Sequence, residues 1–537
     1  MADSLSVGRV LGDRPFAEVG FPSVAAVSEE RGVVVVGGAV GPPGWQPGTL
    51  TSGRSTHRIG VYSLDDLRCR YLLPSRWPVS TVAFHPVLPL AAVGTGSYDG
   101  GFFYQGRLLL LDLLSGDAVS ALGSEREVRS ARWRNERRLD LVLAATDDES
   151  GESDSWCFAV SLVREDWAAL GGEAIGPAEL DGEPVAWVRG ADPEAALRTL
   201  ESLSAGRRNV TFTPRRQVRA VEPLRDGRVL AALDGVRLES WLPSGLREWT
   251  APVPGGGGRR IVVAPGQRAA WVEVQWPPGR DGPRVRYRPN GAELLSLQNG
   301  DVVRPAGSQT PVAVTGRQDG WVMLLDTEHS PAEAATILVS PEQEESAPLD
   351  LGQYEFANTT FVIRRSPELL FLQPTQDGVR ISAVEPSGAV RPLFPLDWDA
   401  GRGARLSGGP GVRLPDALVH AATVVPHGPR RRIEAFVVRR RADGEPEWVF
   451  ECEAVVTAMD AAGDTVLVAL DSGEVVALGA ADGRPRWRRS LTVHGMPVSP
   501  MSLAIPEDGR VLIGTADGRI LDARYRTVPS ESPPARN

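Results

Sequence analysis

Short apolar runs, separated by turns that contain glycine, repeat along most of this chain. The clearest copy lies between Val79 and Val119, where two apolar runs are joined by one turn and followed by a second turn at Gly116. Another copy lies between Gly463 and Trp487. Runs of this length, rich in Val, Leu, Ile and Phe and bounded by Gly, Asp and Ser, predict β-strands joined by tight turns.

Two kinds of turn recur at regular intervals. The first is a tight Asp-Gly or Ser-Gly hairpin between apolar strands, at Gly235, Gly320, Gly378, Gly473 and Gly518. The second follows the next strand, at Gly116, Gly245, Gly291, Gly388, Gly444 and Gly483. The intervals match the roughly 40–50 residues of a four-stranded blade, with one interval long enough for two blades. The sequence therefore predicts an all-β fold, a β-propeller built of repeated four-stranded blades.

About seven to ten blades can be proposed from this pattern. The ten candidates lie near residues 20–75, 79–122, 127–180, 215–250, 259–298, 308–340, 350–397, 412–450, 453–490 and 496–527. Since propellers usually have about 4–8 blades, we expect one toroid over 16–527 with insertions. Two propellers with a seam near Gly255–Gly258 are the alternative, and the Gly-rich stretch Gly401–Gly411 is a second possible seam. Residues 1–15 are expected to form an N-terminal segment and residues 528–537 a disordered tail.

One segment breaks the β pattern. Residues 192–206 begin with Asp192 and Pro193, end at Gly206, and place apolar residues on one face, which together predict a helix. A helix packed on the rim of the wheel is one interpretation, and a docking helix for a partner is the other.

Composition limits the function more than it defines it. The chain has 537 residues, a net charge of −10 and three widely spaced cysteines, and all 58 of its basic residues are arginine. The missing lysine reflects either a genome rich in G and C or selection against lysine modification, and it excludes P-loop, kinase and Schiff-base lysines. No apolar run reaches the roughly 20 residues of a membrane helix, and no export signal is visible. We therefore expect a cytoplasmic protein that does not bind membranes.

Two stretches resemble known propeller families. Val79–Gly116 resembles a WD-repeat blade, with Leu111-Asp112 where that family has Trp-Asp. Ala477-Leu478, followed by Gly483 and Trp487, is similar to the tryptophan-docking motif of pyrroloquinoline-quinone-type propellers, although Gly479 replaces the usual Asp. In that family the tryptophan stacks between blades and the glycine makes the turn, and Trp448 and Trp249 follow Gly444 and Gly245 at the same interval. The resemblance implies a propeller that serves as a platform for proteins, and it does not imply quinone binding.

Catalytic and metal-binding patterns are weak throughout the chain. The six histidines have no Cys or His partner at zinc spacing, and no nucleophile elbow is present. His85 lies in a blade turn, where we expect a structural hydrogen bond. The acidic stretch Asp147–Asp154 misses the spacing of a calcium loop, so a solvated acidic hairpin is the simpler interpretation. We expect no catalytic residues, no cofactor and no metal.

Two groups of residues are candidates for protein binding. Tyr98, Phe102, Phe103 and Tyr104 fall in a hairpin, where exposed aromatic rings could anchor an interface; the alternative is that they fold back onto the wheel. Two arginine triplets flank one strand and could form a basic patch for phosphate or an acidic partner; the alternative is a solvated blade edge. The triplets are Arg430, Arg431 and Arg432, and Arg439, Arg440 and Arg441. The negative net charge makes nucleic acid an improbable partner.

These patterns lead to one preferred function and two alternatives. We expect a non-enzymatic bacterial scaffold that presents one wheel face to protein partners, with ATPase-linked regulatory or defence modules suggested by family analogy alone. A quinone- or small-molecule-binding propeller enzyme is the first alternative. An outer-membrane assembly scaffold is the second, and it would need a lipoprotein signal.

Overall fold

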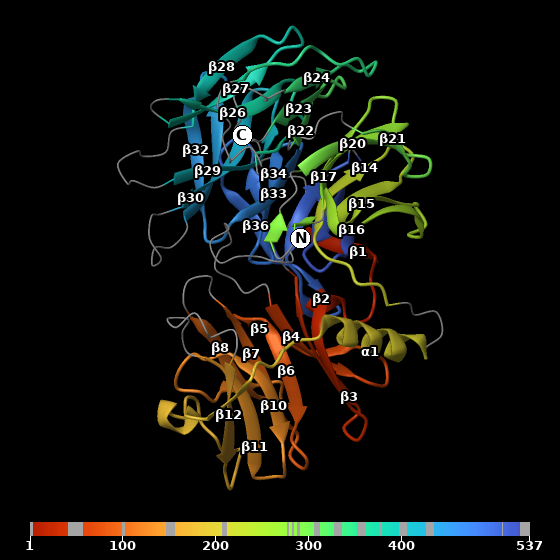
Figure 1. Cartoon of the computed structure of the whole chain (residues 1–537). Helices are drawn as coiled ribbons and strands as arrows, with labels where there is room; N and C mark the ends of the chain where they lie inside the picture. Colours follow the sequence, from red (N-terminus) through yellow and green to blue (C-terminus); the bar gives the residue numbers. More distant parts are fainter. Residues whose placement is uncertain are drawn as a thin grey trace, which may run out of the picture. The chain divides into compact units, whose positions relative to one another are not determined.

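The computed structural model describes residues 4–40, 57–98, 103–145, 156–206, 212–276, 279–281, 284–286, 290–305, 312–326, 336–351, 361–375, 378–396, 405–425, 434–506 and 508–526. Within these residues the chain forms one α-helix, short 3-10 turns and a series of mostly antiparallel β-sheets. The sheets follow one another along the sequence as blades (Figure 1). The predicted all-β propeller fold with four-stranded blades is therefore confirmed.

The contacts divide the chain into two compact units. The smaller unit comprises Asp13–Arg216, and the larger comprises Met1–Gly12 together with Gln217–Asn537. The chain passes from one unit to the other after Gly12 and again after Arg216, whereas the glycine run Gly255–Gly258 lies inside the larger unit. Whether the whole chain forms one wheel or two stays a prediction.

The smaller unit contains three four-stranded sheets in chain order. They match the candidate blades near 20–75, 79–122 and 127–180. Their strands are β2 (Phe21–Ser28), β3 (Val33–Ala39), β4 (His57–Ser63) and β5 (Cys69–Ser75); β6 (Val79–Phe84), β7 (Leu90–Tyr98), β8 (Tyr104–Asp112) and β9 (Ala118–Ser120); and β10 (Val128–Trp133), β11 (Arg138–Ala144), β12 (Trp156–Val163) and β13 (Glu183–Ala186).

The three sheets stack through their first strands, because β6 contacts both β2 and β10. Hydroxyl groups bridge the stack: Ser23 Oγ donates to the Val79 carbonyl oxygen at 3.0 Å, and Ser80 Oγ donates to that of Val128. Apolar side chains fill the space between neighbouring sheets. Continuous apolar runs are expected for strands covered on both faces, which explains why β3 and β7 are almost wholly apolar.

The two ends of this stack differ, because a helix packs against the first sheet and polar side chains lie on the third. The helix α1 (Pro193–Ala205) runs beside β2 (Figure 1) and buries Leu200 against the first sheet. The predicted N-cap is confirmed, since the Asp192 carboxylate accepts a hydrogen bond from the Ala195 amide at 3.0 Å. Within the described residues the helix therefore packs on the fold, as the structural interpretation expected.

At the other end, the outer face of the third sheet carries a polar cluster beside the exposed Val163. The Asp140 carboxylate accepts hydrogen bonds from Arg138 Nε at 3.0 Å and from Ser161 Oγ at 2.7 Å, and it also pairs with Arg134. Leu139 and Leu141 alternate with these residues and face the second sheet. A polar outer face on a terminal repeat keeps a stack of repeats soluble.

The larger unit contains the remaining blades. Its strands are β1 (Ser4–Leu11), β14 (Val218–Pro223), β15 (Val229–Trp241), β16 (Arg247–Val263), β17 (Ala269–Gln275), β18 (Gly279–Asp281), β19 (Arg284–Arg286), β20 (Asn290–Ser296), β21 (Val302–Pro305), β22 (Val312–Gly316), β23 (Val322–Asp326), β24 (Ile337–Val339), β25 (Ile363–Arg364), β26 (Leu369–Thr375), β27 (Gly378–Val384), β28 (Val390–Pro395), β29 (Arg405–Arg413), β30 (Ala417–Val425), β31 (Glu434–Arg441), β32 (Pro446–Cys452), β33 (Val456–Ala462), β34 (Thr465–Leu470), β35 (Glu474–Gly479), β36 (Pro485–Ser490), β37 (Thr492–Val493), β38 (Met496–Pro497), β39 (Pro500–Ala504), β40 (Arg510–Thr515) and β41 (Ile520–Arg526).

Seven candidate blades account for these strands. A six-stranded sheet, β14-β15-β16-β17-β20-β21, covers the two candidates near 215–250 and 259–298. Its two long strands change partner part of the way along: β15 pairs first with β14 and then with β16, and β16 pairs first with β15 and then with β17. The other five candidates correspond to five separate sheets.

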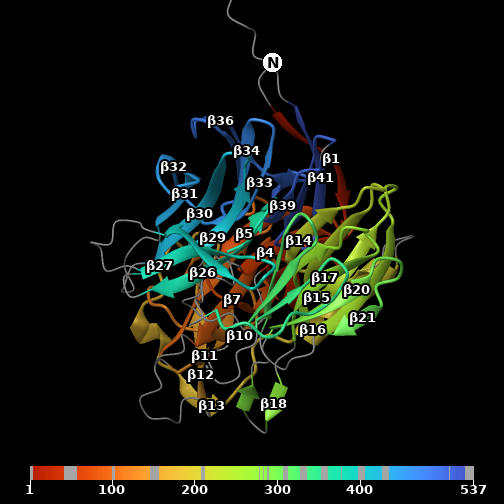
Figure 2. The same ribbon diagram turned by 90° about the horizontal axis from the view of Figure 1, so that it is seen from above.

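The sheets of the larger unit close into a ring. The innermost strand β39 contacts β33 on one side and β14 on the other, so the last sheet in the chain meets the first sheet of this unit. Ser502 Oγ donates to the Val218 carbonyl oxygen at 2.8 Å across this junction. In Figure 2, β14, β33 and β39 lie toward the middle of this unit, and β21, β32 and β36 lie at its rim.

The N-terminal strand completes the last sheet of the ring. β1 pairs antiparallel with β41 and supplies the outer strand that β39–β41 lack. Arg9 holds this strand in place, since its guanidinium pairs with Asp522 at 2.7 Å. Residues 1–15 were expected to form an N-terminal segment, and within it Ser4–Leu11 form part of a blade.

One predicted turn is wrong. Gly291 lies inside β20, so it does not end a turn between strands. The turn glycine of that blade is Gly300, whose φ is 79° and which lies against the indole of Trp249. The Asn-Gly dipeptide at Gly291 has the composition of a turn, but the pairing of β20 with β17 extends through it.

Candidate functional site

The predicted aromatic hairpin lies between β7 and β8 in the smaller unit. Tyr98 pairs with Tyr104 across the two strands, and their ring centroids are 4.9 Å apart. Tyr98 is 38% exposed and Phe103 is 52% exposed, whereas Tyr104 is buried. Phe102 lies outside the described residues. The exposed rings of Tyr98 and Phe103 fit the interpretation as an interface, and the buried ring of Tyr104 fits the interpretation that the hairpin folds back onto the wheel.

An arginine that the sequence did not single out organises this region. The Arg129 guanidinium is buried and lies over the Tyr104 ring, at 5.3 Å from its centroid, and over the Trp187 ring, at 5.1 Å. Trp187, which follows β13, is 47% exposed. We call Tyr98, Phe103, Tyr104, Arg129 and Trp187 the aromatic surface. No sequence spacing links Trp187 to the hairpin, because they belong to different sheets and Arg129 lies over a ring of each.

The Glu127 carboxylate balances the charge of Arg129. Glu127 lies 3.4 Å from Arg129 Nε, and Arg129 Nη1 is 3.7 Å from the Cys157 sulfur. Burial raises the pKa of Glu127, and the nearby Arg129 charge opposes that shift only in part. Arg129 is thereby held as a fixed cation beneath exposed rings, an arrangement that combines cation–π stacking with a rigid apolar surface.

The arginine triplets do not form the expected basic patch within the described residues. Arg430, Arg431 and Arg432 lie outside those residues. Arg439 and Arg440 are interior: Arg439 pairs with Asp416 at 2.6 Å and with Glu447 at 2.7 Å. Arg440 donates to His420 Nε2 at 3.2 Å and to the Gly444 carbonyl oxygen at 2.9 Å. Arg441 is exposed and pairs with Asp443 at 3.0 Å.

This corrects the expected patch at the second triplet. Alternation along β31 would expose every other residue of a strand with one free face. Here β31 lies between β30 and β32 in its sheet, and the neighbouring turns provide partners for two of the arginines: Asp416 for Arg439 and the Gly444 carbonyl oxygen for Arg440.

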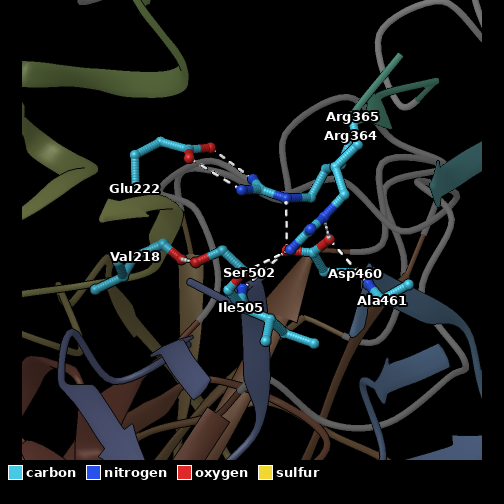
Figure 3. A network of polar contacts seen from close by, with 8 residues as sticks. All are labelled: Val218, Glu222, Arg364, Arg365, Asp460, Ala461, Ser502 and Ile505. Atoms are coloured by element: carbon cyan, nitrogen blue, oxygen red, sulfur yellow. Dashed lines mark hydrogen bonds and ion pairs between the residues drawn. The ribbon is translucent and has the colours of Figure 1, made fainter. Parts of the chain in front are cut away.

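A polar network occupies the middle of the larger unit (Figure 3). Arg364 donates two hydrogen bonds to the Glu222 carboxylate, at 2.5 and 2.9 Å, and its Nε lies 3.2 Å from Asp460. Arg365 donates to Asp460 at 2.7 Å and to the Ile505 carbonyl oxygen at 2.6 Å. We call Arg364, Arg365, Glu222 and Asp460 the axial clamp.

The axial clamp connects blades that are not neighbours in the ring. Glu222 belongs to β14, Asp460 to β33, and Ile505 follows β39. Arg364 lies in β25, which precedes β26 but pairs in parallel with β29. From β25, the Arg364 side chain reaches both β14 and β33, so it must cross the centre of the ring. The axial clamp therefore joins opposite sides of the ring. Although burial opposes the shift, the carboxylates of Glu222 and Asp460 raise the pKa of Arg364 above its ordinary value.

Two histidines, His85 and His420, have structural environments. His85 Nδ1 accepts hydrogen bonds from the Val87 and Leu88 amides at 3.0 and 2.9 Å, so its Nε2 donates to the Glu136 carbonyl oxygen at 2.9 Å. The expected structural role of His85 is confirmed. Burial, with a smaller contribution from Arg440, lowers the pKa of His420 to about 3.

The described part of the chain contains neither a candidate metal site nor a candidate membrane helix. No group of three or more His, Cys, Asp or Glu side chains there is placed to hold a metal ion. No helix of those residues is both long enough and apolar enough to span a membrane.

One family model matches the C-terminal part of the chain. The family described as outer membrane protein assembly factor BamB matches residues 380–527, which include Trp448 and Gly483. The expected resemblance to pyrroloquinoline-quinone-type propellers is confirmed over these residues. Curated proteins gave no match. Among solved structures, the WD40 β-propeller domain of Doa1 is similar at 13% identity, over 59% of this chain and 94% of that chain, with a TM-score of 0.37.

Proposed function

We propose that this protein is a non-enzymatic scaffold that binds protein partners, and that the aromatic surface of the smaller unit is a contact site. The observation that carries the proposal is the cluster of Tyr98, Phe103 and Trp187, exposed by 38%, 52% and 47%, around the buried Arg129. Tyr, Trp, Phe and Arg are the residues most enriched where protein interfaces gain their binding energy.

The rigidity of the cluster supports this role. Tyr104 is interior and stacks with both Tyr98 and Arg129, so the exposed rings are attached to a fixed base. A preordered surface loses little conformational entropy when a partner binds. We place the protein in the bacterial cytosol, and its link to an ATPase module rests on family analogy alone.

The family match supports a second candidate. The family that matches residues 380–527 is described as an outer membrane protein assembly factor, so a role in the assembly of outer-membrane proteins is the second candidate. Fractionation of the native host distinguishes the two: recovery in the soluble cytosolic fraction favours the first candidate, and recovery with the envelope favours the second.

The test compares matched variants of the full chain. Phe103→Ser and Trp187→Ser should retain the thermal stability of the wild type within about 0.5 kcal/mol, because exposed positions tolerate substitution. Each should weaken binding of a purified partner, first identified by capture from the host, by roughly 2 kcal/mol, or about thirtyfold in Kd. Leu114→Ser is the control, since Leu114 is 72% exposed but lies in the turn at the other end of β8.

The outcomes separate a contact site from a packing site. Partners that bind the wild type and Leu114→Ser equally well, but bind the other two variants weakly, support the proposal. Equal binding by all four proteins contradicts it. Turnover of a substrate, or a spectral change on adding pyrroloquinoline quinone and calcium, would favour the enzyme alternative.

A further inference from the structure

Four arginines and three carboxylates gather in the larger unit, on strands β14 to β20. Three ion pairs account for all the carboxylates: Arg219 with Asp234 at 2.8 Å, Arg237 with Glu293 at 2.9 Å, and Arg260 with Glu273 at 3.2 Å. The fourth arginine, Arg259, donates instead to the neutral side-chain oxygen of Gln275, with Nε at 3.1 Å. Within the described residues, Arg259 is left without a carboxylate at ion-pair distance.

Arg219 and Arg259 occupy equivalent positions in two neighbouring blades. Each is the extra residue of a β-bulge, at which the register shifts between Val218 and Ala220 and between Gly258 and Arg260. A bulge redirects the side chain that it contains. The strands that carry these bulges, β14 and β16, are in contact.

The same bulge in other blades carries a hydroxyl group. Thr457 is the extra residue in β33, and its Oγ1 donates to the Pro500 carbonyl oxygen of the next blade at 2.9 Å. Ser23 bridges in the same way in the smaller unit. Two adjacent blades of the larger unit therefore have an arginine where β2, β6 and β33 have a hydroxyl residue that links blade to blade. At the same bulge β39 has Met501, and β10 has Arg129, which pairs with Glu127.

These two arginines are incompletely compensated. Burial, followed by repulsion from Arg219, lowers the pKa of Arg259 to about 10, despite the opposing charges of Glu273 and Asp234. Arg219 Nη2 is buried and has no hydrogen-bond partner among the described residues. Asp234, which pairs with Arg219, likewise has a buried oxygen, Oδ2, without a partner among those residues. A largely buried cation without a counter-ion is costly. The missing anion is therefore that of Arg259, and Nη2 of Arg219 offers such an anion a second donor.

We propose that Arg219 and Arg259 bind an oxyanion, a carboxylate or phosphate group supplied by a ligand. The planar guanidinium presents paired donors that match the two oxygens of such a group. The Arg219 side chain is 16% exposed, so the site borders solvent. This inference goes beyond the proposed scaffold function and does not depend on it, since it concerns a different unit and different residues.

The first experiment titrates the full chain with sodium phosphate, sodium acetate and a hexaglutamate peptide at constant ionic strength maintained with sodium chloride. We expect saturable heat in isothermal titration calorimetry and a higher melting temperature with at least one of the three, because a ligand that binds only the folded state stabilises it. Binding of phosphate identifies a small oxyanion as sufficient. Binding of the peptide without binding of phosphate or acetate identifies an acidic protein segment as the source.

Two variants test the residues from opposite directions. Arg259→Gln should weaken anion binding about tenfold or more, and it should keep or raise the melting temperature without anion because an unpaired charge is removed. Gln275→Glu should also abolish anion binding, since it supplies an internal carboxylate to Arg259, and it should stabilise the protein. Arg268→Gln is the matched control: Arg268 is an exposed arginine of the same blade, just before β17, and it should bind the anion like the wild type.

The outcomes decide the proposal. It is overturned if none of the three probes gives saturable heat or a shift in melting temperature, or if Arg259→Gln and Gln275→Glu both bind as the wild type does. If Arg259→Gln fails to fold, Gln275→Glu still decides, because it adds a partner and removes none. Failure here leaves the aromatic surface unaffected, and failure of partner binding at Phe103 leaves this site unaffected.

Discussion

The indole ring of Trp448 lies directly on Gly483, the turn glycine of the next blade. A Cβ atom at residue 483 would lie 2.6 Å from Cδ2 of Trp448, which is too close for any real side chain. Trp448 Nε1 also donates to the Ala480 carbonyl oxygen at 3.1 Å. The tryptophan-docking arrangement inferred by resemblance is thus present, and the pair Trp249 and Gly300 repeats it in another blade, with a corresponding distance of 2.7 Å.

Gly483→Ala should destabilise the larger unit by more than its backbone strain alone would. Gly463 is the control: its φ of 56° is similar to the 66° of Gly483, but nothing lies within 4 Å of its Cβ position. We expect about 1 kcal/mol for Gly463→Ala and at least about 2 kcal/mol for Gly483→Ala, measured by urea unfolding. Equal losses would contradict packing of the indole against this glycine.

The role of β1 as the outer strand of the last sheet can be tested with two variants of that strand. Leu5 is fully buried, whereas Val7 is 38% exposed in the same strand. Leu5→Ala should cost about 2–5 kcal/mol, and Val7→Ala should cost about 0.5 kcal/mol or less. If β1 were a detached segment, both variants would melt like the wild type in calorimetry.

Breaking the axial clamp should be far more costly than breaking an exposed ion pair. Asp460 is buried and serves both Arg364 and Arg365, so Asp460→Asn leaves two cations without their shared anion. Removal of one partner from a buried pair costs about 3–5 kcal/mol. Asp443→Asn, which breaks the exposed pair with Arg441, should leave the unfolding free energy unchanged. Similar unfolding curves for the two variants would argue against a structural clamp.

His420 should make the protein less stable in mild acid. Its pKa is about 3 in the folded chain and about 6.5 in an unfolded chain, so the unfolded state binds the extra proton between these values. Stability from this residue is therefore complete above about pH 6.5 and falls as the pH drops toward about 3. His420→Gln should flatten the dependence of the unfolding free energy on pH by up to about 1.4 kcal/mol per pH unit. An unchanged slope in urea melts between pH 7 and 4.5 would refute this assignment.

The aromatic surface shows how far sequence reasoning reached at the site. Tyr98, Phe103 and Tyr104 could be selected because a run of aromatic residues in a hairpin is visible along the chain. The burial of Tyr104 could not be read in this way, because Arg129 from the next sheet lies over its ring. The error at Arg439 and Arg440 has the same origin. Asp416, just before β30, and Glu447, in β32, both reach Arg439, and the Gly444 turn folds back on Arg440.

The sequence by itself determined the local features of this protein: the strands, the ten candidate blades, most glycine turns and the capped helix at Pro193–Ala205. These follow from apolar periodicity, positive φ and helix capping, which act over a few residues. Only the tertiary structure decided that Ser4–Leu11 complete the last sheet, that Arg364 reaches Glu222 across the ring, and that Arg259 has no carboxylate partner among the described residues. These features arise from contacts between residues far apart in the chain, whose partners are chosen by closure of the ring rather than by any neighbouring residue.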